Sequence, residues 1–176
     1  MMTIGRAPDW QTTEWLYTSS PLSLVALRGK IVMLTAFQML CPGCVAEGVP
    51  QAQRVAATFK SSDVAVIGLH SVFEHHDAMG PNALRAFLHE YKIRFPVGVD
   101  APDGTGLPHT MRNYDFQGTP TTLLYDREGQ LRRHVFGHIS DLQLGTELMA
   151  LICEQRAAPA EITPEASAVC TIDGCR

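Results

Sequence analysis

The sequence lacks an apolar run long enough to cross a membrane. A membrane helix needs about 20 consecutive apolar residues, and the longest run here, from Ile31 to Phe37, has the length of a strand. It also lacks a block of basic residues, and with a net charge of −4 this disfavours a nucleic-acid or membrane-surface partner. The N-terminus has neither the charged nor the apolar region of a secretory signal, so we expect a cytoplasmic protein.

The sequence also lacks the cysteine pattern of a small protein that is held together by disulfide bonds. Its 176 residues are enough for one domain with its own core, and the five cysteines are an odd number that does not suit a disulfide framework. From residue 156 onward, alanine, proline and glutamate dominate the sequence. We therefore predict one domain over residues 1–155 and a flexible tail over 156–176, which carries Cys170 and Cys175.

Alternating strand and helix patterns predict an α/β fold. Two continuous apolar runs, Ile31–Phe37 and Val64–Leu69, are typical of strands buried on both faces, and residues 45–59 between them have apolar side chains at helical spacing. A second helical stripe from Leu84 to Tyr91, a short strand over Phe95–Val99, a hairpin and a last helix follow; the hairpin strands are Thr121–Tyr125 and Leu131–Phe136, and Ser140 or Asp141 is expected to cap the helix. The order predicts a mixed central sheet with helices on both faces.

The motif Cys41-Pro42-Gly43-Cys44 follows the first buried strand and opens the first predicted helix. A helix N-terminus offers free N–H donors and partial positive charge, which favour a thiolate at the first cysteine. Cys41 would then be the exposed nucleophile, and Cys44, one turn further on, the buried thiol that resolves the mixed disulfide. Pro42 suits an early helical position, where its missing N–H is not needed.

Two other interpretations of the cysteines remain open. The pair could simply pack in the core, or it could share a metal ion with the tail pair Cys170 and Cys175, because a zinc site needs further ligands. The tail pair could also relay electrons to or from Cys41. Cys153 falls near the apolar stripe of the last helix and is expected to be buried.

A second motif, Gly118-Thr119-Pro120-Thr121, leads into an apolar strand. Proline cannot donate to a strand ladder, and a cis bond before it is the usual explanation at a tight, functional corner. Such a corner beside a C-x-x-C motif would leave backbone groups of Thr119 free to pair with an extended substrate.

These motifs together resemble the thioredoxin-like redoxin family, which includes the TlpA/ResA-type thiol–disulfide oxidoreductases and the AhpC/TSA peroxiredoxins. The resemblance covers roughly residues 7 to 152. Beyond the two motifs above it rests on the opening APDW at residues 7–10, on LSLVALRGKIV at 22–32, on Glu47 three residues after the second cysteine, and on DREG at 126–129.

The resemblance implies a thioredoxin-like fold and a role for each matching residue. Cys41 would attack a protein disulfide, Cys44 would resolve it, Glu47 would tune the proton affinity of the thiols, and Pro42, Thr119 and Pro120 would contact the substrate. The partners would be a disulfide-containing protein substrate and a dithiol reductant protein, and the protein itself would be a monomer or a weak homodimer. No cofactor is implied beyond the redox-active disulfide itself, and no metal.

Three positions depart from the family pattern. Leu40 replaces the usual tryptophan before the motif, Thr35 stands where thioredoxin has an aspartate, and Pro50 comes one residue later than the family's helix proline. Without a buried acid at position 35, Glu47 or water would have to accept the proton of Cys44.

The same residues allow an alternative in which the chain is a PrxQ-like thiol peroxidase. There Cys44 would be the peroxidatic cysteine, Cys41 would replace the pocket threonine, Phe37 would replace an upstream proline, and Arg112 or Arg132 would have to activate the thiol. A non-catalytic redox-sensing module would use the same cysteine pair as a switch.

The histidines His70, His75 and His76 lie at and after the end of the second buried strand. They could bind copper or zinc with Cys41 and Cys44, as in Sco-like proteins, but those proteins use a C-x-x-x-C spacing that this chain lacks. A solvated loop with one histidine capping the strand end is the simplest interpretation, and a loop that flanks the cysteine pair and selects partners is an intermediate one.

Overall fold

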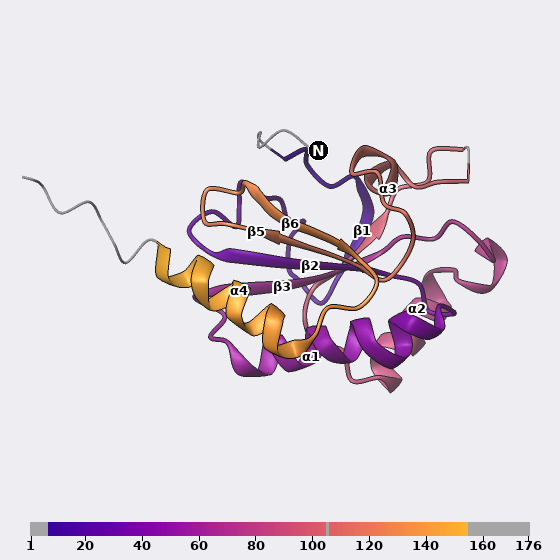
Figure 1. Cartoon of the computed structure of the whole chain (residues 1–176). Coiled ribbons are helices and arrows are strands. Elements are labelled where there is room, and N and C mark those ends of the chain that lie inside the picture. Colours follow the sequence, from indigo (N-terminus) through magenta and orange to yellow (C-terminus); the bar gives the residue numbers. More distant parts are fainter. Residues whose placement is uncertain (1–6, 105, 155–176) are drawn as a thin grey trace, which may run out of the picture.

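A computed structural model describes residues 7–104 and 106–154 as a six-stranded mixed sheet with helices on both faces (Figure 1). The predicted boundary at residue 155 and the tail with Cys170 and Cys175 lie outside the described residues. The strands are β1 (Thr12–Leu16), β2 (Ile31–Phe37), β3 (Val64–His70), β4 (Val97–Asp100), β5 (Thr121–Tyr125) and β6 (Leu131–Phe136), in the spatial order β1-β4-β3-β2-β5-β6.

The two predicted buried strands form the centre of this sheet. β2 pairs in parallel with β3 over its full length, from Ile31 opposite Val64 to Phe37 opposite His70, and in antiparallel with β5 on its other side. All seven residues of β2 are buried. A strand covered on both faces needs no polar alternation, which explains why its sequence is almost uninterruptedly apolar.

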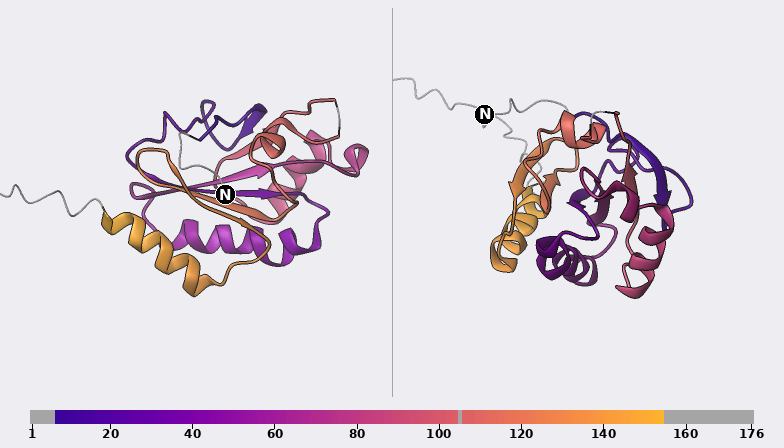
Figure 2. Two further views of the ribbon diagram at one scale, coloured as in Figure 1. Left: turned by 45° about the horizontal axis from the view of Figure 1, so that its top comes forward. Right: turned by 90° about the vertical axis from the view of Figure 1, so that its right-hand side faces the viewer.

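The long helices gather on one face of the sheet. α1 (Val49–Thr58) connects β2 to β3, and α2 (Pro81–Glu90) connects β3 to β4. Both connections lead to the adjacent strand in the same direction across the sheet. Because such crossovers are right-handed, two that run in the same direction place their helices on the same face. α4 (Asp141–Glu154) lies beside α1 on that face, as Figure 1 and the turned views of Figure 2 show.

The opposite face is covered by α3 (His109–Asn113) and by the segment before β2. Its core includes Trp10, Leu24, Tyr114 and Tyr125, with the Trp10 indole N–H donating to the Tyr125 hydroxyl at 3.2 Å. The sheet therefore has an apolar cluster on each side, as the α/β prediction required.

The structure differs from the sequence-based expectations in four features. β1 pairs with β4 at the sheet edge although residues 10–23 showed little periodicity, and α3 is too short to show a helical stripe. The predicted strand over residues 95–99 begins at Val97 instead. Cys153, expected to be buried in α4, is exposed.

The termini of four strands meet at one end of the sheet. β2 ends at Phe37 and β3 at His70, while β5 begins at Thr121 opposite Phe136 of β6. Because the cysteine motif follows β2 and the Gly118–Thr121 motif leads into β5, this topology brings the two motifs to the same end of the sheet.

Replacing Leu148 by alanine is expected to lower the free energy of unfolding by about 2–5 kcal/mol, because the Leu148 side chain is 0% exposed in the core between α4 and the sheet. Leu142→Ala on the same helix is the matched control, since Leu142 is 86% exposed, and its effect should stay within about 0.5 kcal/mol. Chemical denaturation measures both variants. Equal effects would contradict the packing of α4 described above.

Candidate active site

Cys41 lies at the start of the helix that follows β2, with its sulfur partly exposed. The backbone N–H of Cys44 donates to Cys41 Sγ at 3.2 Å, and Val45 N–H donates to the Cys41 carbonyl at 3.1 Å. Cys41 Sγ also lies 3.3 Å from the carbonyl oxygen of Thr119. The Cys41 sulfur therefore accepts a backbone N–H at the start of the helix and donates to the Thr119 carbonyl, which holds it beside the Gly118–Thr121 motif.

Cys44 has the opposite environment. Its side chain is 0% exposed and belongs to the main core cluster. Burial raises the pKa of the Cys44 thiol to about 12, and its hydrogen bond with Cys41 acts in the same direction. The structure therefore separates the two thiols into an accessible one and a protected, protonated one.

The helix that carries the cysteines widens just after them. Cys44–Gly48 forms a π-helical turn, in which Val49 N–H bonds to the Cys44 carbonyl, before α1 continues. Pro50 has no N–H to donate to the preceding turn, and a wider turn before a proline accommodates both that loss and the ring. The late position of Pro50 thus has a local structural effect, which the sequence patterns did not reveal.

Pro120 packs directly against this helix. The Thr119–Pro120 peptide is cis, as expected from the sequence. A Cβ atom placed on Gly48 would lie 2.8 Å from Pro120 Cβ, and one on Gly43 would lie 3.4 Å from Pro120 Cδ. The Pro120 carbonyl accepts the N–H of Gly137 at 2.8 Å, which ties this corner to the segment after β6. Pro120, Thr119 and Cys41 are therefore brought together as predicted.

Two large apolar side chains next to the two motifs are exposed at the surface. Leu40, immediately before Cys41, and Phe136, at the end of β6, are each 56% exposed. The Phe136 ring covers Gly118, where a Cβ would lie only 2.9 Å from a ring carbon. The leucine that replaces the family tryptophan thus still contributes apolar surface beside the nucleophile. Sequence reasoning did not identify Phe136, because its position beside Gly118 depends on the β5–β6 pairing.

Glu47 lies on the same helical turn as Cys44, and its carboxylate is exposed. Its Oε2 atom is 3.9 Å from His138 Nδ1, and Glu47 is not among the groups that shift the pKa of Cys44. The role of Glu47 in tuning the thiols stays a prediction. Thr35, at the position of the thioredoxin aspartate, is buried, and its hydroxyl oxygen has no hydrogen-bond partner within the described part of the chain.

His70 and His76 line one small cavity, but His75 is not among its lining residues. His70 is buried at the end of β3, where its ring lies 5.4 Å from that of Phe37, and burial lowers its pKa from 6.5 to about 4. His75 and His76 are exposed. No group of three or more metal-ligating side chains occurs among residues 7–104 and 106–154.

Gln38, which sequence reasoning did not single out, connects the loop after β3 to the cysteine motif. Its side-chain oxygen accepts the Phe73 N–H, and its backbone carbonyl accepts the Cys41 N–H.

The arginines that a peroxidase would need are engaged elsewhere. Arg132 lies at the start of β6, at the end of the sheet remote from Cys44, where it pairs with Asp126 and Glu154. Arg112 pairs with Asp103. Neither arginine is among the groups that shift the pKa of Cys44.

Comparison with known proteins agrees with this geometry. The profile of the AhpC/TSA family matches residues 5–134. A crystal structure of a thioredoxin-like superfamily protein is 52% identical, with a TM-score of 0.84 over 86% of this chain and 98% of that one. A thiol-disulfide isomerase from Corynebacterium glutamicum is 48% identical, with a TM-score of 0.81 over 84% of this chain and 96% of that one. The thioredoxin-like fold expected from the sequence is therefore confirmed.

A curated relative is much longer. The protein DipZ of Mycobacterium bovis and Mycobacterium tuberculosis is 28% identical over 172 residues, which are 96% of this chain but only 24% of DipZ. This chain thus spans about a quarter of the curated relatives that it matches. In the described ranges no helix is long and apolar enough to cross a membrane. The cytoplasmic location expected from the sequence has no support in these comparisons and stays a prediction.

We expect Gly48→Ala to lower the free energy of unfolding by about 1–3 kcal/mol, because its Cβ would overlap with Pro120. Gly145→Ala is the matched control, since nothing lies within 4 Å of a Cβ there and alanine should stabilise α4 by about 0.5–1 kcal/mol. Chemical denaturation of the two variants gives the comparison. Equal stabilisation by both would rule out the close contact between Pro120 and the helix.

His70 should make the fold sensitive to acid. Its folded pKa of about 4 lies below its ordinary value of 6.5, so its neutral form stabilises the fold fully above pH 6.5, and this contribution is lost as the pH falls toward 4. The free energy of unfolding should fall there by up to about 1.4 kcal/mol per pH unit from this group. His70→Phe should flatten that part of the profile, whereas His76→Gln at an exposed position should not. Parallel profiles for His70→Phe and the unaltered protein would refute the assignment.

Proposed function

Because the chain belongs to the AhpC/TSA family, we propose that it is a thiol–disulfide oxidoreductase that reduces or exchanges protein disulfides through Cys41 and Cys44. The observation that carries the proposal is the asymmetry of the two thiols. Cys41 is accessible and accepts a backbone N–H, whereas Cys44 is fully buried with its pKa raised to about 12. The similarity to a thiol-disulfide isomerase at 48% identity supports the same chemistry.

In the first step the Cys41 thiolate attacks one sulfur of the substrate disulfide. A bond forms between Cys41 and that sulfur, and the other substrate sulfur leaves as a thiolate and takes up a proton. In the second step Cys44 gives up its proton and attacks Cys41 Sγ, which releases the second substrate thiol and leaves a Cys41–Cys44 disulfide. Two electrons have then passed to the substrate, and a dithiol reductant protein returns them.

The surface around Cys41 suits an extended polypeptide. The cis Pro120 corner places the backbone of Thr119 beside Cys41 Sγ, and the Pro120 carbonyl is already occupied by Gly137 N–H. A substrate strand would therefore pair with Thr119, pack its side chains on Pro42 and Pro120, and meet the apolar side chains of Leu40 and Phe136 on either side. Whether the protein mainly reduces or oxidises disulfides depends on the redox potential of its compartment relative to that of the Cys41–Cys44 pair.

A PrxQ-like peroxidase remains the second candidate, but the geometry disfavours it. A peroxidatic Cys44 would have to be an accessible thiolate, whereas it is buried and its pKa is raised. A redox-sensing module would use the same Cys41–Cys44 exchange without turnover, so only turnover of a substrate separates it from an enzyme.

Cys41→Ser is expected to reduce disulfide reductase turnover to the uncatalysed background, because it removes the attacking sulfur. Cys44→Ser should attack once and then stay joined to its substrate, so non-reducing electrophoresis should show a mixed disulfide at Cys41. Cys153→Ser, at an exposed position on α4, is the matched control and should keep full turnover.

The same variants decide between the two candidates. If peroxide consumption is fast, survives Cys41→Ser and disappears in Cys44→Ser, the peroxidase assignment is correct and the nucleophile proposed above is wrong. If Cys44→Ser keeps full disulfide turnover, Cys44 is not the resolving thiol.

A further inference from the structure

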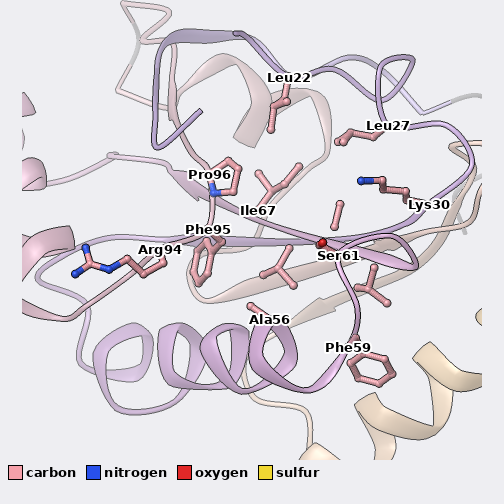
Figure 3. A pocket seen from close by; sticks show the side chains of 13 residues that line it. Leu22, Leu27, Lys30, Ala56, Phe59, Ser61, Ile67, Arg94, Phe95 and Pro96 are labelled. Atoms are coloured by element: carbon pink, nitrogen blue, oxygen red, sulfur yellow. The ribbon is translucent and has the colours of Figure 1, made fainter. Parts of the chain in front are cut away.

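A cavity of about 340 Å³ opens at the end of the sheet remote from the cysteines. It exists because β4 pairs only with Gly68–His70, so the first half of β3 has no neighbouring strand on that side. Figure 3 shows the cavity between the segment before β2 on one side and α1 on the other. Its lining residues are Leu22, Leu27, Lys30, Ala56, Phe59, Ser61, Val64, Ala65, Val66, Ile67, Arg94, Phe95 and Pro96.

The walls of the cavity are mostly apolar, and two cationic side chains, Lys30 and Arg94, are among the lining residues. Leu22 and Leu27 come from one layer of the fold, and Ala56 and Phe59 come from the other. In Figure 3 the ammonium of Lys30 points toward the middle of the lining residues, whereas the Arg94 guanidinium turns outward. A cavity of this size, with apolar walls and few polar groups, is typical of small-molecule sites.

The two cations lack an acidic partner within the described part of the chain. No ion pair is recorded there for Lys30 or Arg94, whereas Arg54, Arg85 and Arg132 each pair with a carboxylate. Asp63, next to the cavity in sequence, lies 3.9 Å from Arg127 instead. In a chain of net charge −4, an apolar cavity into which the unpaired ammonium of Lys30 points is complementary to an amphipathic anion.

The strand beside the cavity does not offer its backbone to a peptide. Val64, Val66 and Ile67 are each less than a tenth exposed, so another strand could not pair with this half of β3 without displacing its covering side chains. The cavity volume lies near the lower end of the roughly 300–1,000 Å³ that is typical of small-molecule sites. The space therefore suits a compact ligand better than a polypeptide.

We propose that this cavity binds an apolar monocarboxylate of about ten non-hydrogen atoms, with its carboxylate at Lys30 and its apolar body between Leu27, Ala56 and Ile67. Ser61, at the same cavity, adds a hydroxyl that can donate to the carboxylate. The site is separate from Cys41 and Cys44, and the proposal does not rest on their chemistry.

Calorimetric titration of the full chain with octanoate, which has about ten non-hydrogen atoms, tests the proposal. Octanoate should bind at one site at concentrations below those at which it forms micelles, and octanol and octylammonium should bind at least about tenfold more weakly because they lack the negative charge. Equal binding of octanol or octylammonium would overturn the assignment of an anion. Binding to anionic vesicles but not to monomeric octanoate would show a membrane-surface patch instead.

Variants locate the site. Ala56→Phe fills the cavity from an exposed position on α1 and should abolish binding, while Ala57→Phe, exposed on the same helix but outside the cavity lining, should leave it unchanged. Lys30→Met keeps the apolar stem and should raise Kd about tenfold, whereas Lys92→Met should not change it. Thermal unfolding of each variant verifies that it is folded. Wild-type affinity in Ala56→Phe or in Lys30→Met would refute the site.

Discussion

The contact between Pro120 and the helix after β2 is the constraint on which the site depends. It joins two motifs whose first residues, Cys41 and Gly118, are 77 positions apart in the sequence, because Pro120 lies against Gly43 and Gly48 at distances that leave no room for a side chain at residue 48. The same corner bonds to Gly137 after β6. Helix, proline corner and the last hairpin therefore hold one another in place, and the carbonyl of Thr119 comes to lie 3.3 Å from Cys41 Sγ.

Around that contact the fold gives chemically identical thiols different properties. Cys41 lies before the first full helical turn, where the Cys44 N–H reaches its sulfur. Cys44 lies one turn deeper, in the core, where loss of hydration favours the neutral thiol. A pair of this kind attacks from one sulfur and protects the other until a mixed disulfide has formed. The order of events in the proposed reaction follows from burial more than from sequence spacing.

The opposite end of the sheet is built more loosely. β4 begins only at Val97, so half of β3 has a neighbour on one side only, and a cavity remains where a longer strand would have filled the layer. α1 connects the two ends, because Ala56 and Phe59 line the cavity while the π-helical turn with Cys44 precedes the same helix. One short helix thus contributes to both the redox site and the proposed carboxylate site.

The sequence by itself determined the central strands, the α/β class and the identity of the two motifs, because buried parallel strands and a C-x-x-C at a helix start have strong local signatures. It also indicated the cis Pro120, since a proline before an apolar strand has few alternatives. Only the tertiary structure decided features that depend on neighbours distant in sequence. β1 required β4 as its partner, Glu47 turned out to face His138, and Phe136 reached the site through the β5–β6 pairing. The sequence also predicted Cys41 as the accessible sulfur and Cys44 as the buried one, but only the packing decided that the burial of Cys44 is complete, because exposure depends on neighbouring side chains.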